Sequence, residues 1–411
     1  MRILAIETSC DETAMSLLET SDGTTFDLLA HEVSSQIEMH REWGGVVPML
    51  AKREHNKTLP VILEKIAGKV LSSKRKAQSA KLADLIAVTY GPGLEPALWT
   101  GIVFAKELAT KWGVPIVATD HMHGHVVSAM LKLNSNGKAQ SSNVTYGLQE
   151  IHYPAIALLI SGAHTELVLM RSMGEPARTT ESDGFEILGH TVDDAVGEAF
   201  DKVARMLGLP YPGGPEISKL ASKFVPESLA SGKSGDEAFG PNAIKLPRPM
   251  LHSKDYNFSF SGLKTAVLYL VKNIREKNKL LGLIDENGDG ILSDETKCEI
   301  AYEFEQAVTE VLIKKTERAI AEHGAKSLLV GGGVIANKAI RKALSQLQGL
   351  TLKLYLPDNK FTGDNATMIG VAALLRLGYA GQGYLHPEHL LTSGTPEFEA
   401  LSARGNLNLY K

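Results

Sequence analysis

Short apolar runs separated by polar turns follow one another in the same order in both halves of the chain. In each half, a strand, a polar turn and a return strand form a predicted β-hairpin. The first hairpin is predicted at residues 3–6, 7–13 and 14–18, and the second at residues 155–160, 161–164 and 165–170. The repetition indicates that the two halves share one structural plan.

A second feature follows each hairpin: a buried strand that leads through a glycine-rich turn into a helix. Residues 84–88 lead through Gly91-Pro92-Gly93 into a predicted helix at residues 96–112. Residues 327–330 lead through Gly331-Gly332-Gly333 into a predicted helix at residues 337–347. Strands that alternate with helices are typical of α/β layers. The sequence therefore predicts an α/β protein with two like lobes and a cleft between them.

Four polar or glycine-rich turns stand at predicted strand ends, at residues 7–13, 91–93, 161–164 and 331–333. Such turns let the backbone approach a phosphate group or a nucleotide closely. Glycine-rich turns are also common between ordinary strands, so each turn alone is weak evidence. Together they favour a nucleotide-binding cleft. The chain has neither the lysine of a Walker P-loop nor the Rossmann glycine fingerprint, which argues against those two nucleotide folds.

Three histidines, His121, His123 and His125, follow a predicted strand at residues 114–118. The apolar residues that come next predict a helix through residue 131. On a helix His121 and His125 share one face, and His123 points about 200° away from His121. Two imidazoles at this spacing can hold one divalent metal. Two alternatives remain open: ordinary surface histidines, or an extended turn in which His123 is a ligand as well.

The composition narrows the class of protein. Of the 411 residues, 44% are hydrophobic and 22% charged, which is ordinary for a soluble globular protein. The length predicts two domains or one large bilobal domain. No apolar run reaches the length of about 18 residues that predicts a membrane span. Met1-Arg2 leads at once into a strand, which leaves no room for a targeting segment. Cys10 and Cys298 are too few for a disulfide framework, so we expect a reducing, cytoplasmic setting.

A nucleic-acid partner would need a local basic patch, because the formal net charge is −4. Basic residues cluster at residues 52–57, at residues 74–76, and at Lys338, Arg341 and Lys342. Each cluster alone is more typical of a solvated helix face than of a binding surface.

Two segments have the composition of insertions. Residues 226–242 are rich in Ser, Gly and Glu, which predicts a surface loop. Residues 285–292 imitate the start of an EF-hand calcium loop, but Thr296 stands where that loop has its bidentate glutamate. We therefore expect a solvated turn between two helices there.

Several long motifs resemble those of the tRNA N6-adenosine threonylcarbamoyltransferase family, once described as O-sialoglycoprotein endopeptidases. The motifs keep the family's order nearly end to end, and two of them, with the chain length, resemble the bacterial branch. The matching segments are residues 6–13, 44–48, 91–93, 121–125, 197–202, 211–215 and 258–265, then 332–334 with Asn337, and Asp364-Asn365 with Met368-Ile369.

The resemblance implies the fold more closely than the pattern does. Family members are built from two actin-like lobes, of the RNase H-like type shared with sugar kinases and heat-shock chaperone ATPases. The implied division is an N-terminal lobe at residues 1–153, a C-terminal lobe at residues 154–380 whose end partly packs back on the first lobe, and a tail at residues 381–411.

The resemblance also implies a metal site. Asp364 matches the aspartate that joins the two histidines, which gives the ligand set His121, His125 and Asp364. From the residues alone, Asp364 could equally be the N-cap of a helix at residues 366–377. Two imidazoles and a carboxylate suit several divalent metals. Iron is the first choice, with zinc, manganese or magnesium as alternatives.

Nucleotide contacts are carried over from the family position by position. The loop that cradles the adenylate phosphate matches Leu159, Ile160, Ser161, Gly162 and Ala163. Asp201 and Gly214 match the contacts on the ribose side, and Asn337 matches the residue at the adenosine end. Without the resemblance, these positions would be interpreted as a β-hairpin turn, a solvated helix carboxylate, a loop glycine and a helix N-cap.

The chain departs from the family's usual pattern at three places. Ala163 replaces the second glycine of the phosphate loop, where its methyl group could crowd the backbone. His123 stands where the family has glutamate, and Thr362-Gly363 stands where it has Cys-Thr or Ser-Thr. None of these changes removes a predicted metal ligand.

The implied activity is transfer of a threonylcarbamoyl group from L-threonylcarbamoyl-adenylate to N6 of the adenosine 3′ of the anticodon, with release of AMP. The tRNAs are those that read codons starting with A. Glu12 and Asp11, on the first polar turn, are candidates for the general base, with Glu12 preferred. Implied partners are tRNA, a smaller inactive paralogue and a P-loop ATPase, with no membrane.

Two rival functions remain from other classes. A metallopeptidase of the zincin type needs glutamate directly after the first histidine, where this chain has Met122. An actin-like ATPase or sugar kinase that acts as a switch would explain the two lobes and the phosphate loops. It would not explain a metal held by two histidines.

Overall fold

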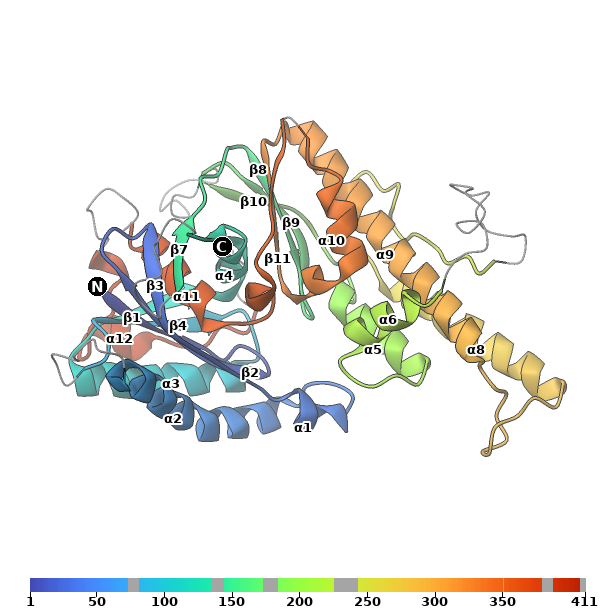
Figure 1. Ribbon diagram of the computed structural model, residues 1–411, viewed down its shortest axis with the longest axis horizontal. Coiled ribbons are helices and arrows are strands. Elements are labelled where there is room, and N and C mark those ends of the chain that lie inside the picture. The colour runs from blue at the N-terminus through green and yellow to red at the C-terminus, as the bar shows by residue number, and fades with distance from the viewer. Residues whose placement is uncertain are drawn as a thin grey trace.

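Two β-sheets form the framework of the chain in the computed structural model, which describes residues 1–72, 81–134, 144–172, 184–224, 243–349, 351–378 and 387–406 (Figure 1). The first sheet has the strand order β5-β4-β1-β2-β3-β7-β6 and the second has the order β10-β9-β8-β11-β12. The strands of the first sheet are β1 (Arg2–Glu7), β2 (Glu12–Thr20), β3 (Thr25–Ser35), β4 (Leu85–Gly91), β5 (Ile116–Asp120), β6 (Leu131–Leu133) and β7 (Val144–Leu148). Those of the second are β8 (Ala155–Ile160), β9 (Thr165–Met170), β10 (Phe185–His190), β11 (Ser327–Gly331) and β12 (Lys353–Tyr355).

The two sheets repeat one arrangement, as the sequence pattern predicts. Each has a central antiparallel hairpin, β1–β2 in the first sheet and β8–β9 in the second, with a third antiparallel strand beside it. On the other side of each hairpin lie two parallel strands, β4 and β5 or β11 and β12. The prediction of two like α/β lobes is confirmed.

The first hairpin differs from its prediction in one detail. The polar turn was predicted at residues 7–13, but Glu12 and Thr13 already belong to β2, where they pair with Ser35 and Ser34. The long partner strand β3 supplies backbone hydrogen bonds that no local pattern shows. The second hairpin has its predicted bounds.

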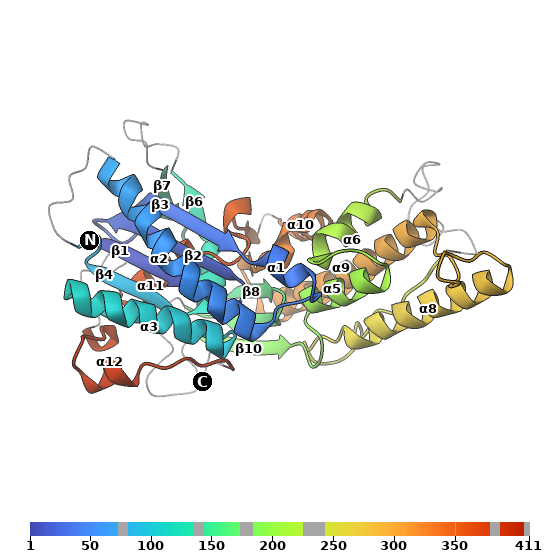
Figure 2. The ribbon, with the colours of Figure 1, turned by 90° about the horizontal axis from the view of Figure 1, so that it is seen from below.

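Helices cover both faces of the first sheet. On one face lie α2 (Pro48–Ser72) and α3 (Glu95–Trp112), which pack side by side (Figure 2). Apolar side chains of these helices, such as Ile66 and Ile102, form one core with strand residues such as Ile6 and Val88. On the other face lies α11 (Ala366–Arg376), which is buried through most of its length. The short α1 (Ile37–Arg41) precedes α2.

Helix α4 (His121–Ser128) lies between the two sheets and carries the histidine motif. Met122 and Val126 pack in a core with residues of β8 and β11, while Val127 packs in the core beneath the first sheet. Gly331 permits this close packing, because a Cβ there would lie 2.5 Å from the carbonyl oxygen of His125. The helix ends at Ser128, earlier than predicted, because Leu131 enters strand β6.

The remaining helices build the second lobe. Long helices α8 (Ser261–Leu280) and α9 (Asp294–His323) run outward from the second sheet (Figure 1). Their connection, which includes residues 285–292, is a solvated turn as predicted, and Asp285 caps its own turn by accepting from the Asn287 and Asp289 amides. The others are α5 (Val196–Met206), α6 (Gly213–Ala221), η2 (Gly333–Ala336) and α10 (Lys338–Ser345). Residues 226–242, predicted as a surface loop, lie outside the described residues.

The end of the chain returns to the first lobe. After η3 (Asn359–Phe361), α11 crosses to the first sheet, and its Gly370 would clash with Leu18 of β2 if it carried a Cβ. The last described segment, with η4 (Pro387–His389) and α12 (Pro396–Ala400), buries Phe398 against the face that α3 covers. The lobe boundary at residue 153 and the tail from residue 381 stay predictions. Within the described ranges no helix is long and apolar enough to cross a membrane.

Candidate active site

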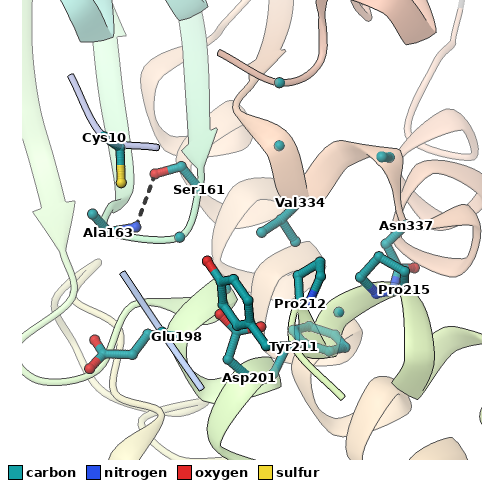
Figure 3. Close-up of a pocket in the computed structure, with 18 of the residues that line it drawn as sticks. Cys10, Ser161, Ala163, Glu198, Asp201, Tyr211, Pro212, Pro215, Val334 and Asn337 are labelled. Atoms are coloured by element: carbon teal, nitrogen blue, oxygen red, sulfur yellow. Dashed lines mark hydrogen bonds between the residues drawn. The ribbon is translucent and has the colours of Figure 1, made fainter. Parts of the chain in front are cut away.

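A large cavity of about 1520 Å³ is lined by residues from both halves of the chain. It brings together Asp11, Glu12, His121 and Asp364 at one end with Ser161, Gly162, Ala163, Asp201, Gly214 and Asn337. Figure 3 shows Ser161 and Ala163 on one side of the pocket and Asn337 with Pro215 on the other. Three predicted site residues do not line it: Leu159 and Ile160 are buried in β8, and His125 lies behind His121 and Asp364.

His121, His125 and Asp364 form a compact cluster. Asp120 caps α4 through its Oδ1, which accepts from the His123 amide at 2.9 Å, so the helix begins at His121. The Nε2 atoms of His121 and His125 lie 3.5 and 3.2 Å from Asp364 Oδ1. Among the described residues, this is the one group of three His, Cys, Asp or Glu side chains close enough to hold a metal ion.

Asp364 faces the histidines because a different residue caps the helix that follows. The N-cap of α11 is Asn365, whose Oδ1 accepts from the Met368 amide at 3.0 Å. The alternative of Asp364 as the N-cap is therefore wrong. Burial raises the pKa of Asp364, but His121 and His125 outweigh it and hold the pKa well below its usual range.

The cluster fits a divalent metal. Both ring nitrogens of His125 are buried and neither makes a well-aligned hydrogen bond within the described ranges, although Nε2 lies 3.2 Å from Asp364 Oδ1. A buried polar atom without a well-aligned partner costs about 1–3 kcal/mol. Imidazole nitrogens and carboxylate oxygens bind zinc-like ions at about 2.0–2.2 Å. Ligand atoms 3.2 and 3.5 Å apart can share one such ion, which would lie between Asp364 Oδ1 and the two Nε2 atoms.

Glu7 supports this cluster from behind and was missed by the sequence analysis. It is fully buried at the end of β1, and its Oε2 accepts from Thr89 Oγ1 at 2.5 Å and lies 3.1 Å from His121 Nδ1. A proton held on Nδ1 leaves Nε2 free to bind a metal. Burial lowers the pKa of His121, but the carboxylates of Asp364 and Glu7 outweigh it and raise the pKa to about 9. The signals in the sequence were an acidic residue at a strand end and its place in the matching segment at residues 6–13.

Replacement of Glu7 by glutamine is expected to weaken metal binding by about 10- to 100-fold, the usual loss when a group that orients a metal-binding histidine is changed. The amide keeps the shape but can place its NH2 against His121 Nδ1. Titration with a divalent metal, followed by a competing chelator, measures the change. Thr89→Val, which removes only the hydroxyl that supports Glu7, should have a smaller effect. If the glutamine variant binds the metal as tightly as the parent, Glu7 does not orient His121 for metal binding.

Two further carboxylates lie at the same end of the cavity. Glu12 and Asp11 both line it, and Asp11 is held through its carbonyl oxygen by the Gln36 amide. Burial, then the charges of Asp11 and Asp364, raise the pKa of Glu12 well above its usual range. A carboxyl group with a raised pKa is a stronger base when it ionises, so Glu12 is a candidate for proton transfer.

The loop between β8 and β9 approaches the start of α5. Ser161 Oγ accepts from the amides of Ala163 and His164 at 3.3 and 3.0 Å, which closes the turn (Figure 3). Gly197, at the start of α5, donates to the Ser161 carbonyl, and a Cβ on Gly197 would lie 2.6 Å from that oxygen. The N-terminus of α5 therefore points toward the loop, an arrangement that favours anions.

The positions predicted for the ribose and the adenosine end are held in a second network. Asp201 Oδ1 accepts from the Gly213 amide at 2.6 Å and so fixes the start of α6, beside Gly214. Burial raises the pKa of Asp201 to about 6. Asn337 is the N-cap of α10, as the alternative interpretation held, and it also lines the cavity.

Comparison with known proteins decides the family. A profile of the family described as tRNA N6-adenosine threonylcarbamoyltransferase matches residues 27–371. The chain belongs to this family. Proteins of that name from Thermosipho africanus and Ralstonia pickettii are 41% identical over 377 residues and 40% identical over 378 residues. These matches cover 90% and 92% of this chain and 93% and 92% of the relatives.

A solved structure supports the fold. The crystal structure of full-length HypF in the phosphate- and nucleotide-bound form has a TM-score of 0.51 and 12% sequence identity. The match covers 93% of this chain and 47% of HypF, so the chain spans about half of that protein. The predicted actin-like, two-lobe α/β fold is confirmed. As a member of the tRNA N6-adenosine threonylcarbamoyltransferase family, the chain is a transferase that modifies tRNA.

In this transferase the side chain of His123, where the family has glutamate, points into the protein interior. The His123 ring packs edge-on against Phe185, with 5.9 Å between ring centroids, and its Nε2 is buried. Burial, then the charge of Arg376, lowers the pKa of His123 to about 4, so the ring is neutral. The helix therefore separates His123 from the two predicted ligands, as its geometry requires, and the extended-turn alternative is wrong.

Replacement of His123 by glutamate is expected to preserve the metal site. The new carboxylate would face Arg376, whose charge already acts on this position. Metal content should match that of the parent, and the transfer rate should fall by less than the 10- to 100-fold loss typical of a group that supports a metal ligand. Metal analysis of the purified variant, beside His125→Ala, checks this. Equal loss of metal from both variants would show that His123 is a ligand.

The other two departures are accommodated without strain. Ala163 is exposed to the cavity, and its backbone is outside the left-handed region, so the methyl group does not crowd the loop. Thr362 is fixed by the Asn359 carbonyl, which accepts from its Oγ1 at 2.9 Å. Gly363 lines the cavity beside Asp364, and its carbonyl accepts from Asn365 Nδ2.

Proposed function

We propose that this transferase moves the threonylcarbamoyl group of L-threonylcarbamoyl-adenylate to N6 of the adenosine 3′ of the anticodon, in tRNAs that read codons starting with A. The N6 lone pair attacks the carbamoyl carbon and forms a new C–N bond. The bond from that carbon to the phosphate oxygen then breaks, and AMP leaves with the electron pair. One N6 proton must be removed in the process.

The observation that carries the proposal is that one cavity is lined by two of the three predicted metal ligands, by Glu12 and Asp11, and by six of the eight predicted nucleotide residues. An adenylate with its base toward Asn337 and its phosphate toward Ser161 would place its acyl group toward His121 and Asp364. The volume of about 1520 Å³ exceeds the range of about 300–1,000 Å³ usual for one small ligand. The remaining space suits an adenosine turned out of the tRNA.

His121, His125 and Asp364 are the residues that would hold the metal, with iron as the first choice and zinc, manganese or magnesium as alternatives. A bound divalent metal would supply Lewis-acid polarisation of the carbamoyl oxygen. Residues of the chain itself would position the substrate. Ser161, Gly162 and Ala163, supported by Leu159 and Ile160 in β8, present the turn and the α5 N-terminus to the phosphate. Asp201 and Gly214, which also line the cavity, would contact the ribose.

Glu12 is the proposed general base, and Asp11 assists it. Both line the cavity, as do His121 and Asp364, and burial, then the charge of Asp11, raise the pKa of Glu12. Glu12 can therefore take the N6 proton as the carbamoyl carbon is attacked. Asp11 would keep Glu12 oriented and basic without touching the nucleophile.

Recognition of tRNA would need cations at the cavity mouth. Lys338 and Lys342 line the cavity from α10, whereas Arg341 of the same cluster is bound to the Pro357 carbonyl. The 52–57 cluster lies on α2, where Glu54 pairs with Arg53 and Lys57. We propose that the smaller inactive paralogue and the P-loop ATPase implied by the family resemblance complete the active assembly in the cytoplasm.

One experiment separates the proposal from its rivals. The purified chain with its two proposed partners is supplied with L-threonylcarbamoyl-adenylate, with and without tRNA, and AMP and phosphate are measured. Release of AMP that depends on tRNA supports transfer. In parallel, the chain alone is given ATP, or a peptide substrate, without tRNA. Release of phosphate from ATP would favour an ATPase or kinase switch, and cleavage of the peptide would favour a metallopeptidase.

A further inference from the structure

A buried histidine of α2, His55, lies behind the turn that carries the proposed base. It is 0% exposed and does not line the cavity. His55 Nε2 lies 3.1 Å from the Cys10 carbonyl oxygen, and His55 Nδ1 lies 2.8 Å from Thr13 Oγ1. Cys10 and Thr13 flank Asp11 and Glu12 in the sequence. One imidazole therefore contacts the chain on both sides of the two carboxylates.

The partners of the His55 ring show which nitrogen carries the hydrogen. Burial lowers the pKa of His55, so the ring is neutral and has one N–H group. A carbonyl oxygen can only accept a hydrogen bond, so Nε2 donates to Cys10. Nδ1 then accepts from the Thr13 hydroxyl and, at 3.3 Å, from Gln36 Nε2.

A row of hydrogen bonds leads to the same hydrogen position from the other side. The Val47 amide donates to His40 Nδ1 at 3.3 Å, so the hydrogen of His40 is on Nε2. That nitrogen lies 3.2 Å from Gln36 Oε1 and donates to it. The Gln36 side chain is thereby turned so that its NH2 faces His55 Nδ1. Every donor in the row meets an acceptor, and His55 can fit it only with the hydrogen on Nε2.

His55 supplies the only side-chain donor among the hydrogen bonds that hold three consecutive carbonyls of the turn. The carbonyls on either side of Cys10 accept from backbone amides, those of Leu94 and Gln36, at 2.7 and 2.9 Å. The Cys10 carbonyl accepts from the His55 side chain. A substitution at residue 55 can therefore release the middle of the turn while the two backbone contacts remain.

The Glu12 carboxyl depends on this turn for its position. It forms a hydrogen bond with its neighbour Asp11, and it lies 3.5 Å from Ser35 Oγ. The second distance exceeds the range of about 2.5–3.0 Å that is usual between a hydroxyl and an oxygen acceptor. Because Asp11 belongs to the same turn, a shift of the turn would move both carboxyl groups.

We propose that His55 is a positioning residue for the transfer reaction, because its hydrogen bond to the Cys10 carbonyl holds the turn so that Glu12 faces the N6 atom of the tRNA adenosine. This role rests on the proposed function, in which Glu12 is the general base. His55 touches neither the substrate nor the metal ligands. Its loss should therefore lower kcat, while metal content and the KM for L-threonylcarbamoyl-adenylate stay close to those of the parent.

Two substitutions separate the two contacts of His55. The side-chain amide of asparagine reaches the position of Nδ1, and that of glutamine reaches the position of Nε2. His55→Asn keeps an acceptor for Thr13 but loses the donor to Cys10, whereas His55→Gln keeps the donor to Cys10. Thr13 is also held by pairing with Ser34 of β3, so the loss of its contact should matter less. Glutamine should rescue the function of His55, and asparagine should not.

Transfer under saturating substrates, with metal analysis of each protein, measures the difference. His55→Asn should lower kcat by about 100-fold, an effect that a misplacement of about 1 Å can produce. The kcat of His55→Gln should be at least about tenfold above that of His55→Asn. Leu59→Ala is the control for lost stability, since Leu59 lies one turn later on α2 and is buried in the core under the first sheet. It should lower Tm and leave kcat unchanged well below Tm.

Hydrogen exchange of the amides of residues 10–13, in the full chain without substrate, tests the contact without the reaction. Exchange should be faster than in the parent in His55→Asn and close to the parent in His55→Gln. Equal exchange in the two variants, or equal kcat while the parent releases AMP in a tRNA-dependent manner, would overturn the inference and leave the proposed transfer intact. Absence of that AMP release in the parent, with exchange in the expected order, would instead overturn the proposed function, and the role of His55 in transfer with it.

Discussion

Replacement of Asp364 by alanine should abolish metal binding and nearly all transfer while the fold is kept. Asp364 Oδ1 is the atom that both histidine Nε2 atoms approach, at 3.5 and 3.2 Å. Without the Asp364 carboxylate, two neutral imidazoles remain, and no negatively charged ligand offsets the charge of a divalent ion. We expect metal affinity to fall by at least about 100-fold, beyond the loss caused by a merely supporting group. Transfer should fall by about 100- to 1,000-fold, as when one group that stabilises developing charge is removed.

The fold should survive this change, because Asn365 and not Asp364 caps α11. Metal analysis, circular dichroism and the tRNA transfer assay together measure the effect. Asp358→Ala, at an exposed aspartate that precedes η3, is the matched control and should retain both metal and activity. Stoichiometric metal in the Asp364 variant would refute the ligand set.

Replacement of Glu12 by glutamine should separate proton transfer from metal binding. Glutamine keeps the shape of Glu12 at the start of β2 but cannot accept the N6 proton. General base catalysis contributes about 100- to 10,000-fold, so kcat should fall within that range. Metal affinity should stay close to that of the parent, because Glu12 is outside the group of potential ligands.

Single-turnover transfer with bound tRNA and a separate metal titration give the two quantities. Glu19→Gln, at the other end of β2 and paired with Arg2, is the matched control and should leave kcat unchanged. A Glu12 variant with normal kcat would move the role of base to another group. A parallel loss of metal would mean that Glu12 acts through the metal site.

Local pattern was sufficient wherever a structure depends on near neighbours. The strands at residues 155–160 and 165–170 have their predicted bounds, because apolar runs and one polar turn define a hairpin without help from distant residues. The spacing of His121 and His125 likewise follows from helix geometry alone. The repeated order of these local elements was enough to predict two like α/β lobes.

Element ends were less predictable, because their partners are distant in sequence. Glu12 and Thr13 belong to β2 only since β3 pairs with them. Helix α4 stops at Ser128 because the chain must enter β6, which pairs with β7. A polar turn and an apolar helix were reasonable local predictions, and hydrogen bonds to other strands overrode them.

The site itself was decided by tertiary structure. The family resemblance supplied Asp364, but only the structure shows that Asn365 caps α11 and that the Asp364 carboxylate faces the histidines of α4. Glu7 lies 114 residues from His121 in sequence, and no spacing rule connects two such positions. Ser218, Glu305 and Asn337 meet only because α6, α9 and α10 pack together. Sequence by itself determined which side chains could do chemistry, and the packing of distant elements determined which oxygen and nitrogen atoms face one another.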